Sequence, residues 1–358
     1  MFDRSQIDDI RIENARPLMP AAILIEEIPH TEATAKLVYE GRRTVRDIVA
    51  GTDRRLLVVI GPCSIHDPSA ALDYAGRLVE TAKDYRDQLV LVMRSYFEKP
   101  RTTVGWKGFI NDPDLDESHQ INKGLRAARH LLRDLAALGL PVGTEFLDMT
   151  VPQFIADFVS WGAIGARTVE SQPHRELASG LSMPIGFKNN TDGHVQSAID
   201  AILAASSPHW FSSNTKHGVA AHFKSTGNPD CHVILRGGSK TGPNFDPMSV
   251  RATASALSRA GLNEHVMVDC SHGNSGKDPA RQAEVSASVA RQIREGSPYI
   301  LGVMIESNLV GGRQDIGRRE LVYGQSVTDA CLSFEDSIPL LDELAEAVAS
   351  RHPVEAHR

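Results

Sequence analysis

The chain has 358 residues, of which 41% are hydrophobic and 23% charged, so it can bury a full-sized core and is no disordered or low-complexity sequence. The formal net charge of −7 argues against nucleic acid and anionic membranes as partners. Four cysteines are too few for a disulfide framework, and neither a signal peptide nor an apolar run of about 20 residues stands out, so we expect a cytoplasmic protein.

The first 55 residues differ from the rest and are predicted to form a helical or strand extension. A helix is expected over residues 31–50, because Thr31 is a good N-cap and Gly51 a good helix terminator. This extension either packs on the main domain as an additional helix or serves as an arm for subunit contact or regulation. The residues alone favour simple packing.

From residue 56 onward, short β-rich runs alternate with helical stretches such as 69–85 and 124–139. Apolar runs separated by helices are typical of parallel strands that are covered on both faces. Eight such units predict an α/β fold, a (β/α)8 TIM barrel over 56–345 with a tail at 346–358; a doubly wound open sheet is the alternative. A hairpin over about 209–230 is expected between the fifth and sixth strands. The runs are 56–61, 89–95, 141–146, 163–168, 184–188, 232–237, 266–271 and 300–306.

A charged or ligating side chain stands at or just past the carboxyl end of each predicted strand. In a barrel these ends converge on one mouth, where active sites are built. One strand-end arginine is usually a solvated surface residue, but eight polar side chains in series predict a functional site. They are Cys63, Arg94, Glu145, Arg167, Lys188, Arg236, His272 and Glu306.

Four members of this series, Arg94, Arg167, Lys188 and Arg236, are cations in a chain that is acidic overall. Guanidinium groups suit bidentate contacts with phosphate and carboxylate. So much positive charge in one mouth repels itself unless an anion compensates it, and pairing with Glu145 and Glu306 would absorb only part of it. The series therefore predicts an anionic ligand.

A second set, Cys63, His272 and Glu306, offers sulfur, imidazole and carboxylate donors. This mixture suits a divalent transition metal better than Mg²⁺ or Ca²⁺. No local metal-binding spacing is present, and Cys270 competes with Cys63 for the sulfur position. His66 is interpreted as a residue that supports its loop rather than as a ligand.

The loop after the second run contains Lys99, Pro100, Arg101 and Thr102 and is expected to overhang the same mouth. Pro100 fixes the backbone, which favours a rigid clasp for an anion. A solvated basic loop is the alternative, but it would not need the nearby Trp106.

Several long segments carry a family resemblance: GPCSIHDP, MRSYFEKPRTTVGWKG, WGAIGART, HVILRGG, VDCSHGNS and GQSVTDAC. Together they resemble the metal-dependent class I 3-deoxy-D-arabino-heptulosonate-7-phosphate (DAHP) synthases, over essentially the whole chain. The resemblance implies condensation of phosphoenolpyruvate with D-erythrose 4-phosphate, the first step of the shikimate pathway. It also implies one divalent metal, Mn²⁺, Fe²⁺, Co²⁺ or Zn²⁺.

The resemblance further assigns residues by position. Lys99, Glu145, Cys63 and His272 would be catalytic, and Lys99–Thr102 would bind erythrose 4-phosphate. The metal ligands would be Cys63, His272, Glu306 and Asp329. The phosphoenolpyruvate pocket would comprise Arg94, Lys99, Glu145, Ala166, Arg167, Lys188 and Arg236.

In feedback-inhibited members an aromatic amino acid binds between the N-terminal arm and a neighbouring subunit, which implies a homo-oligomer, a dimer or tetramer. Phenylalanine or tyrosine is favoured over tryptophan. Two other enzymes are alternatives: 3-deoxy-octulosonate 8-phosphate synthase, which has Ala-Asn-Arg where this chain has Lys-Pro-Arg, and a metal-dependent sugar-phosphate aldolase. A non-catalytic phosphosugar sensor is a further alternative. The matching regulatory positions are Asp8, Asp9, Met149, Gln153, Ser182 and Phe211.

Overall fold

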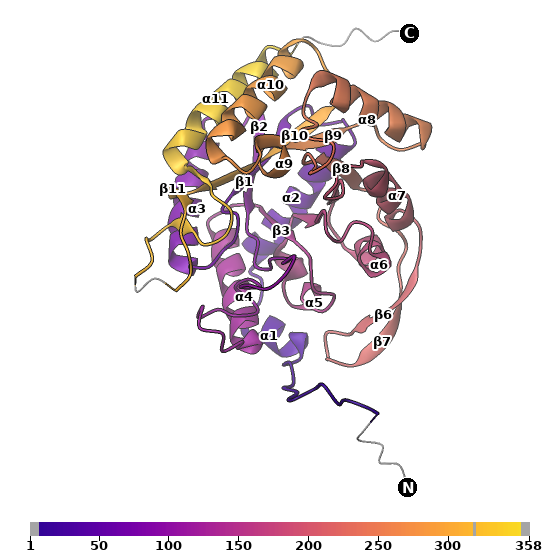
Figure 1. Cartoon of the computed structure of the whole chain (residues 1–358), viewed down its shortest axis with the longest axis vertical. Helices are drawn as coiled ribbons and strands as arrows, with labels where there is room; N and C mark the ends of the chain where they lie inside the picture. Colours follow the sequence, from indigo (N-terminus) through magenta and orange to yellow (C-terminus); the bar gives the residue numbers. More distant parts are fainter. Residues whose placement is uncertain (1–6, 318–319, 352–358) are drawn as a thin grey trace.

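The computed structural model describes residues 7–317 and 320–351, and eight parallel strands form a closed barrel at its centre (Figure 1). Each strand pairs with the next, and β10 pairs back with β1 over residues 57–61. This pairing closes the sheet, which confirms the predicted (β/α)8 barrel and excludes the open sheet. The strands are β1 Leu56–Gly61, β2 Leu89–Arg94, β3 Val142–Glu145, β4 Trp161–Ile164, β5 Ile185–Lys188, β8 Cys231–Leu235, β9 Val266–Asp269 and β10 Ile300–Asn308.

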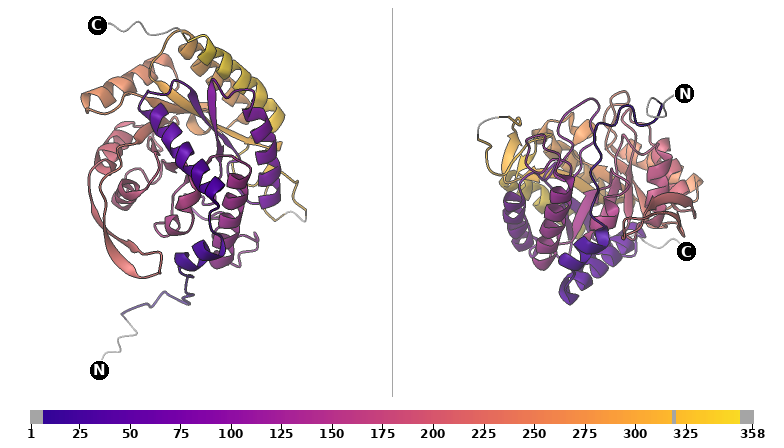
Figure 2. Two further views of the ribbon diagram at one scale, coloured as in Figure 1. Left: turned by 180° about the vertical axis from the view of Figure 1, so that it is seen from behind. Right: turned by 90° about the horizontal axis from the view of Figure 1, so that it is seen from below.

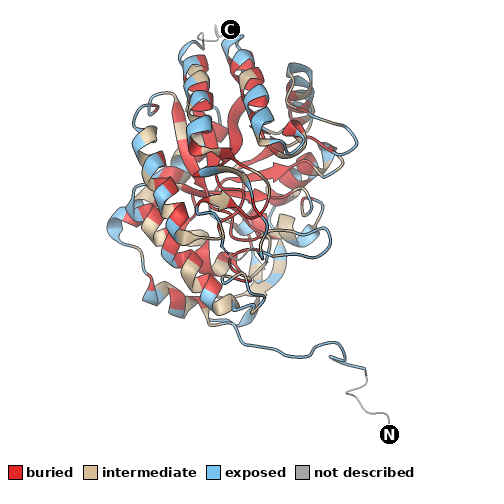
Figure 3. Ribbon diagram, turned by 60° about the vertical axis from the view of Figure 1, so that its left-hand side comes forward, coloured by how far each residue is buried: buried red, intermediate tan, exposed pale blue. Residues whose placement is uncertain are grey.

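Helices surround the barrel, with buried inner faces and exposed outer faces (Figure 3). The side chains of Asp67, Asp246 and Ser333 begin three of them by accepting backbone N–H groups. Among the described residues, no helix combines the length and the apolar character that crossing a bilayer requires. The outer elements are α3 Pro68–Ala82, α4 Ile121–Ala137, α5 Pro152–Ile155, η2 Ala156–Phe158, α6 Gln172–Gly180, α7 Gln196–Ala205, α8 Pro247–Arg259, α9 His272–Ser275, η3 Pro279–Arg281, α10 Gln282–Arg294 and α11 Phe334–Ala349.

The extension is helical in its described part, with α1 Ala21–Glu27 and α2 Glu32–Val49. A capping box between Thr31 and Thr34 begins α2, as the N-cap prediction required. Val45, Ile48 and Val49 of α2 pack into one buried cluster with barrel-interior residues, including Leu57 and Trp161. Seen from behind, α2 lies across the barrel (Figure 2), so the amino ends of the strands are covered.

The predicted hairpin is present as β6 Trp210–Asn214 and β7 Ala220–Lys224, an antiparallel pair between β5 and β8 in the chain. Its turn contacts the extension, because the backbone N–H of Ala22 donates to the carbonyl of Lys216 at 2.7 Å. The hairpin therefore lies outside the barrel and beside α1, as Figure 1 shows.

Beyond β10 the chain folds back over the rim of the barrel through β11 Val310–Arg313, β12 Gln325–Ser326 and β13 Leu332–Ser333. β13 pairs with the end of β10, and β11 pairs with β12. α11 then passes residue 345, the predicted boundary of the tail, and ends at Ala349. The division into extension, barrel and tail stays a prediction.

Candidate active site

The carboxyl ends of the barrel strands surround a cavity of about 110 Å³. Arg94, Glu145 and Lys188 end β2, β3 and β5, and Glu306 lies in β10 opposite Gly61 of β1. β4 begins and ends earlier than predicted, so Arg167 lies in the exposed turn that follows it. Ten predicted site residues line the cavity: Lys99, Pro100, Arg101, Glu145, Ala166, Arg167, Lys188, Arg236, His272 and Asp329.

Cys63 and Thr102, two predicted site residues that do not line the cavity, contact residues that do. Cys63 lies next to Lys99, whose Nζ donates to the Cys63 carbonyl at 3.0 Å and to Sγ at 3.2 Å. Arg167 Nε donates to Thr102 Oγ1 at 3.3 Å, which joins the clasp loop to the turn after β4. The structure thus brings the anion set, the clasp and the metal set together at one end of the barrel.

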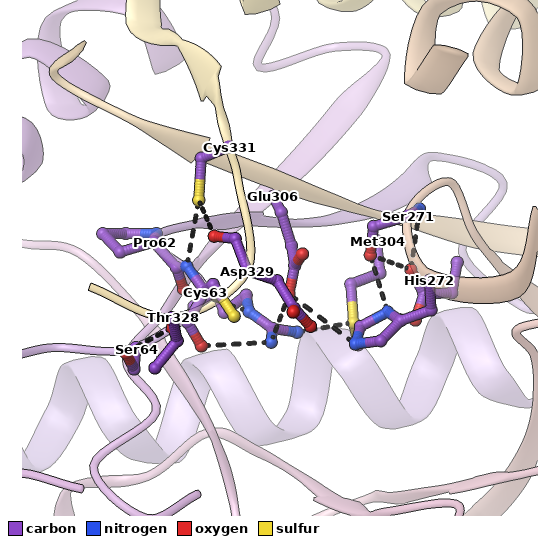
Figure 4. A network of polar contacts seen from close by, with 12 residues as sticks. Pro62, Cys63, Ser64, Ser271, His272, Met304, Glu306, Thr328, Asp329 and Cys331 are labelled. Atoms are coloured by element: carbon purple, nitrogen blue, oxygen red, sulfur yellow. Dashed lines mark hydrogen bonds and ion pairs between the residues drawn. The ribbon is translucent and has the colours of Figure 1, made fainter. Parts of the chain in front are cut away.

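Three donor atoms, one each from Cys63, Glu306 and Asp329, lie within 4.8 Å of one another, close enough to hold a metal ion (Figure 4). The His272 ring lies beside this group, with Nε2 3.7 Å from Glu306 Oε1. Within residues 7–317 and 320–351, neither Cys270 nor His66 belongs to the group. The sulfur position therefore falls to Cys63.

Arg94 is fully buried and holds the floor of the site together. Its Nη2 donates to Glu306 Oε1 at 2.9 Å, and its Nε donates to the Pro62 carbonyl at 3.1 Å. Its guanidinium also lies 3.7 Å from the ring centre of Tyr96. Although burial opposes ionisation, His272 and Arg94 keep the pKa of Glu306 below its usual value, so this donor is a carboxylate.

The Cys63 thiol behaves differently from that carboxylate. Burial raises its pKa and Glu306 adds to this, while Lys99 and Arg94 act in the opposite direction. A cation bound at the thiol would favour the thiolate, because metal ligation requires deprotonated sulfur. The donor set of one sulfur and two carboxylates, with an imidazole beside it, fits a divalent transition metal.

Asp269, at the end of β9, contributes to the site and was not expected from the sequence. Its Oδ2 lies 2.8 Å from His272 Nδ1 and 3.1 Å from Lys188 Nζ. Although burial opposes its charge, His272 and Lys188 hold the pKa of Asp269 well below its usual value. Burial lowers the pKa of His272 and favours a neutral ring. The only sequence feature that could have indicated the role of Asp269 is its position three residues before the candidate ligand His272.

The open side of the cavity is cationic. Burial lowers the pKa of Arg236, Asp269 raises it, and repulsion from Arg167 lowers it further. Because the two guanidinium groups repel each other, an anion bound between them would be favoured. Glu145 lies against Gly165, where an added Cβ would come 2.1 Å from Glu145 Oε1. Glycine at 165 therefore leaves room for this carboxylate at the rim.

A second cavity of about 630 Å³ lies among α5, α6 and the hairpin. Three of the six predicted regulatory residues line it: Gln153, Ser182 and Phe211. Met149 is half-buried and packs against the core, so it does not line this cavity. Asp8 and Asp9 are exposed on the N-terminal segment, which runs away from the barrel (Figure 1).

Comparisons with known proteins agree with this geometry. The model of the DAHP synthetase I family matches residues 27–341. The Phe-sensitive phospho-2-dehydro-3-deoxyheptonate aldolase of Escherichia coli K12 is 54% identical over 347 residues, covering 97% of this chain and 99% of the relative. A tyrosine-inhibited relative from Schizosaccharomyces pombe is 51% identical, covering 98% of this chain and 95% of the relative.

Among solved structures, a phospho-2-dehydro-3-deoxyheptonate aldolase from Francisella tularensis SCHU S4 superposes with a TM-score of 0.94 at 54% identity. That alignment covers 96% of this chain and 100% of the other. The similarity therefore extends over the extension, the barrel and the hairpin alike. The chain belongs to the DAHP synthetase I family.

Proposed function

We propose that this protein is an enzyme that condenses phosphoenolpyruvate and D-erythrose 4-phosphate with water to give DAHP and phosphate. This reaction is the first step of the shikimate pathway to aromatic amino acids. Membership of the DAHP synthetase I family supports the assignment. The observation that carries it is one cavity that joins a cationic wall to the Cys63–Glu306–Asp329 group. A cytoplasmic location stays a prediction.

The turnover is proposed to depend on one divalent metal, Mn²⁺, Fe²⁺, Co²⁺ or Zn²⁺. Cys63, Glu306 and Asp329 would hold it, with His272 as the fourth ligand. When bound, such an ion supplies Lewis acidity to a carbonyl oxygen and stabilises the negative charge that develops there. The low pKa of Glu306 and the lowered pKa of His272 leave both donors in the protonation state that ligation needs.

The resemblance assigns the substrate anions to the remaining side chains. Arg94 and Lys188 are assigned to the carboxylate of phosphoenolpyruvate, and Arg167 with Arg236 to its phosphate. The clasp Lys99–Thr102 is assigned to the aldose phosphate, because Lys99, Pro100 and Arg101 line the same cavity. Holding both substrates in reactive contact can lower the barrier by about 7 kcal/mol or more.

The proposed bond changes begin with attack of C3 of phosphoenolpyruvate on the aldehyde carbon of erythrose 4-phosphate. Lys99 is the proposed acid that protonates the new hydroxyl group, since its Nζ reaches the Cys63 sulfur. Water then adds at C2, which has become cationic, and phosphate leaves with cleavage of its C–O bond. Glu145 is proposed to stabilise C2 or to orient this water.

The second cavity is proposed to bind an aromatic amino acid that inhibits the enzyme. Phe211 offers an aromatic surface, and Gln153 and Ser182 offer polar groups. Completion of this site by Asp8 and Asp9 requires a neighbouring copy, so we propose a homo-oligomer. The names of the E. coli and S. pombe relatives, which refer to phenylalanine and tyrosine, support an effector of this class.

A phosphate-release assay tests the activity. Phosphate should appear with both substrates present and not with either alone, should stop on addition of EDTA, and should resume with Mn²⁺. Arabinose 5-phosphate replaces erythrose 4-phosphate in a parallel reaction. Faster turnover of the pentose phosphate would favour the octulosonate enzyme, and release that persists in EDTA would contradict the metal requirement.

A further inference from the structure

We propose that Asp269 is a positioning residue that orients His272, so that the Nε2 lone pair of the ring faces the Cys63–Glu306–Asp329 group. This inference rests on the proposed metal-dependent function. It concerns a side chain that neither lines the cavity nor belongs to the donor group. Asp269 is a fully buried carboxylate, and the polarity of the hydrogen bonds around it decides which nitrogen of the His272 ring carries the proton.

Both oxygens of Asp269 have polar neighbours, with hydrogen bonds at Oδ1 and ion-pair contacts at Oδ2. Oδ1 accepts from the backbone N–H of Ser271 at 2.9 Å and from the Ser271 hydroxyl at 2.6 Å. Oδ2 contacts His272 Nδ1 at 2.8 Å and Lys188 Nζ at 3.1 Å. The carboxylate therefore joins the end of β5 to the turn after β9, and Lys188 balances its buried charge.

These contacts determine which ring nitrogen carries the proton. The Ser271 hydroxyl has one hydrogen, which it donates to Asp269, so it presents a lone pair to His272 Nδ1 at 2.7 Å. Both neighbours of Nδ1 are then acceptors, and Nδ1 must be the donor. In a neutral ring the lone pair is left on Nε2, the nitrogen that lies 3.7 Å from Glu306 Oε1.

The backbone sets the place of the ring, while Asp269 sets its rotation. His272 has φ +55°, a left-handed conformation that is uncommon outside glycine. The next N–H, of Gly273, donates to the Arg236 carbonyl at 2.9 Å, and a Cβ at 273 would come 2.8 Å from that oxygen. The turn is thus pressed against the loop after β8, and only the ring torsion remains for Asp269 to fix.

Asp269→Asn tests the proposal because it preserves volume but leaves one acceptor oxygen for four donors. Mn²⁺ affinity is measured without substrate, by the loss of the free-ion electron paramagnetic resonance signal. We expect Asp269→Asn to weaken binding by about 10–100-fold. Asp246→Asn, the same change at the N-cap of α8, is the matched control and should bind as wild type does.

A double-mutant cycle with His272→Ala separates positioning from general damage. If Asp269 acts through His272, Asp269→Asn should cause no further loss of Mn²⁺ affinity in the His272→Ala background. Affinity within threefold of wild type, or an equal loss in both backgrounds, would overturn the proposal.

If circular dichroism shows that Asp269→Asn does not fold, the Mn²⁺ affinity of Ser271→Ala is measured instead. A loss of several-fold that disappears in the His272→Ala background supports the inference, and unchanged affinity overturns it. A wild-type protein that binds Mn²⁺ but releases no phosphate would contradict the proposed function and leave the role of Asp269 standing. The two failures are therefore distinguishable.

Discussion

Cys63 can be either a metal ligand or an ordinary buried thiol, and shortening its side chain distinguishes the two roles. We predict that Cys63→Ala loses its metal and lowers turnover by about 100-fold or more, because Lewis-acid stabilisation amounts to several kcal/mol. The fold should survive, since only one small side chain is shortened. Metal content after dialysis, turnover and the melting temperature are the measurements.

Cys270→Ala is the matched control, because Cys270 is equally buried but lies outside the donor group. It should retain metal and activity. A Cys63→Ala protein that is active and metal-replete would remove Cys63 from the site.

A second prediction concerns the buried ring of His232, whose Nε2 accepts a hydrogen bond from Trp161 Nε1 at 2.9 Å. Burial lowers its pKa to about 4, against about 6.5 in the unfolded chain. Its contribution to stability is therefore complete above pH 6.5 and is lost as the pH falls toward 4. At pH 4.5 the loss amounts to about 3 kcal/mol.

His232→Gln cannot take up a proton there, although its amide oxygen can still accept from Trp161. The variant should melt below wild type at pH 7.5, and the difference should shrink steadily between pH 6.5 and 4.5. Melting temperatures across this range provide the check. A difference that stays constant with pH would contradict the assignment.

The sequence pattern predicts some of the site residues and not others, and the difference depends on where each residue lies in the fold. Arg94, Glu145 and Lys188 end barrel strands, and topology alone brings such residues to one rim. Asp329 lies on a segment that folds back over the rim after β12, where no strand pattern marks it, so only the resemblance assigns it. Asp269 ends β9 two residues before the predicted run ends, so the strand pattern does not mark it.

Among the elements, α2 closes the barrel at the end opposite the site. Ile48 is buried among interior residues such as Leu57 and Trp161. We predict that Ile48→Ala destabilises the protein by about 2–5 kcal/mol, through lost transfer free energy and a residual cavity. Because the site lies at the other end of the strands, kcat should stay within about twofold.

Calorimetric melting and steady-state kinetics measure the two effects separately. Tyr39→Ala on the same helix is the control, since its side chain is 67% exposed and its loss should leave the melting temperature almost unchanged. A large fall in kcat for Ile48→Ala at a temperature where it is folded would contradict the separation of the two ends.

Element prediction succeeded where one physical signal dominated. The buried strands are continuous apolar runs, and β1 falls on the predicted residues 56–61. β4 begins two residues before the predicted run and ends at Ile164, because Trp161 and Gly162 already pair with β3. The short strands β11, β12 and β13 have two to four residues and no alternation, so only tertiary pairing defines them.

At the scale of the whole molecule, the N-terminal segment exposes apolar side chains that a single copy of the chain does not cover. Ile7, Ile10 and Ile12 are 59–69% exposed, and Asp8 and Asp9 between them are exposed as well. Apolar side chains gathered on an exposed segment indicate contact with another molecule. We propose a second copy of this chain, whose hairpin cavity the segment would complete.

Deletion of residues 1–15 should therefore abolish inhibition by the aromatic amino acid while kcat and both KM values stay within about twofold. The barrel ends are untouched, and the hydrogen bonds that tie the described N-terminal segment to α4, from Pro17 and Met19 to Asn122, remain in the truncated chain.

Asp8→Asn combined with Asp9→Asn should raise the inhibitor concentration needed for half inhibition at least tenfold, by removing carboxylates from the ammonium group of the effector. Glu13→Gln is the matched control and should leave inhibition unchanged. Titrations with phenylalanine, tyrosine and tryptophan measure this, and a truncated enzyme that is inhibited like the full chain would place the effector elsewhere.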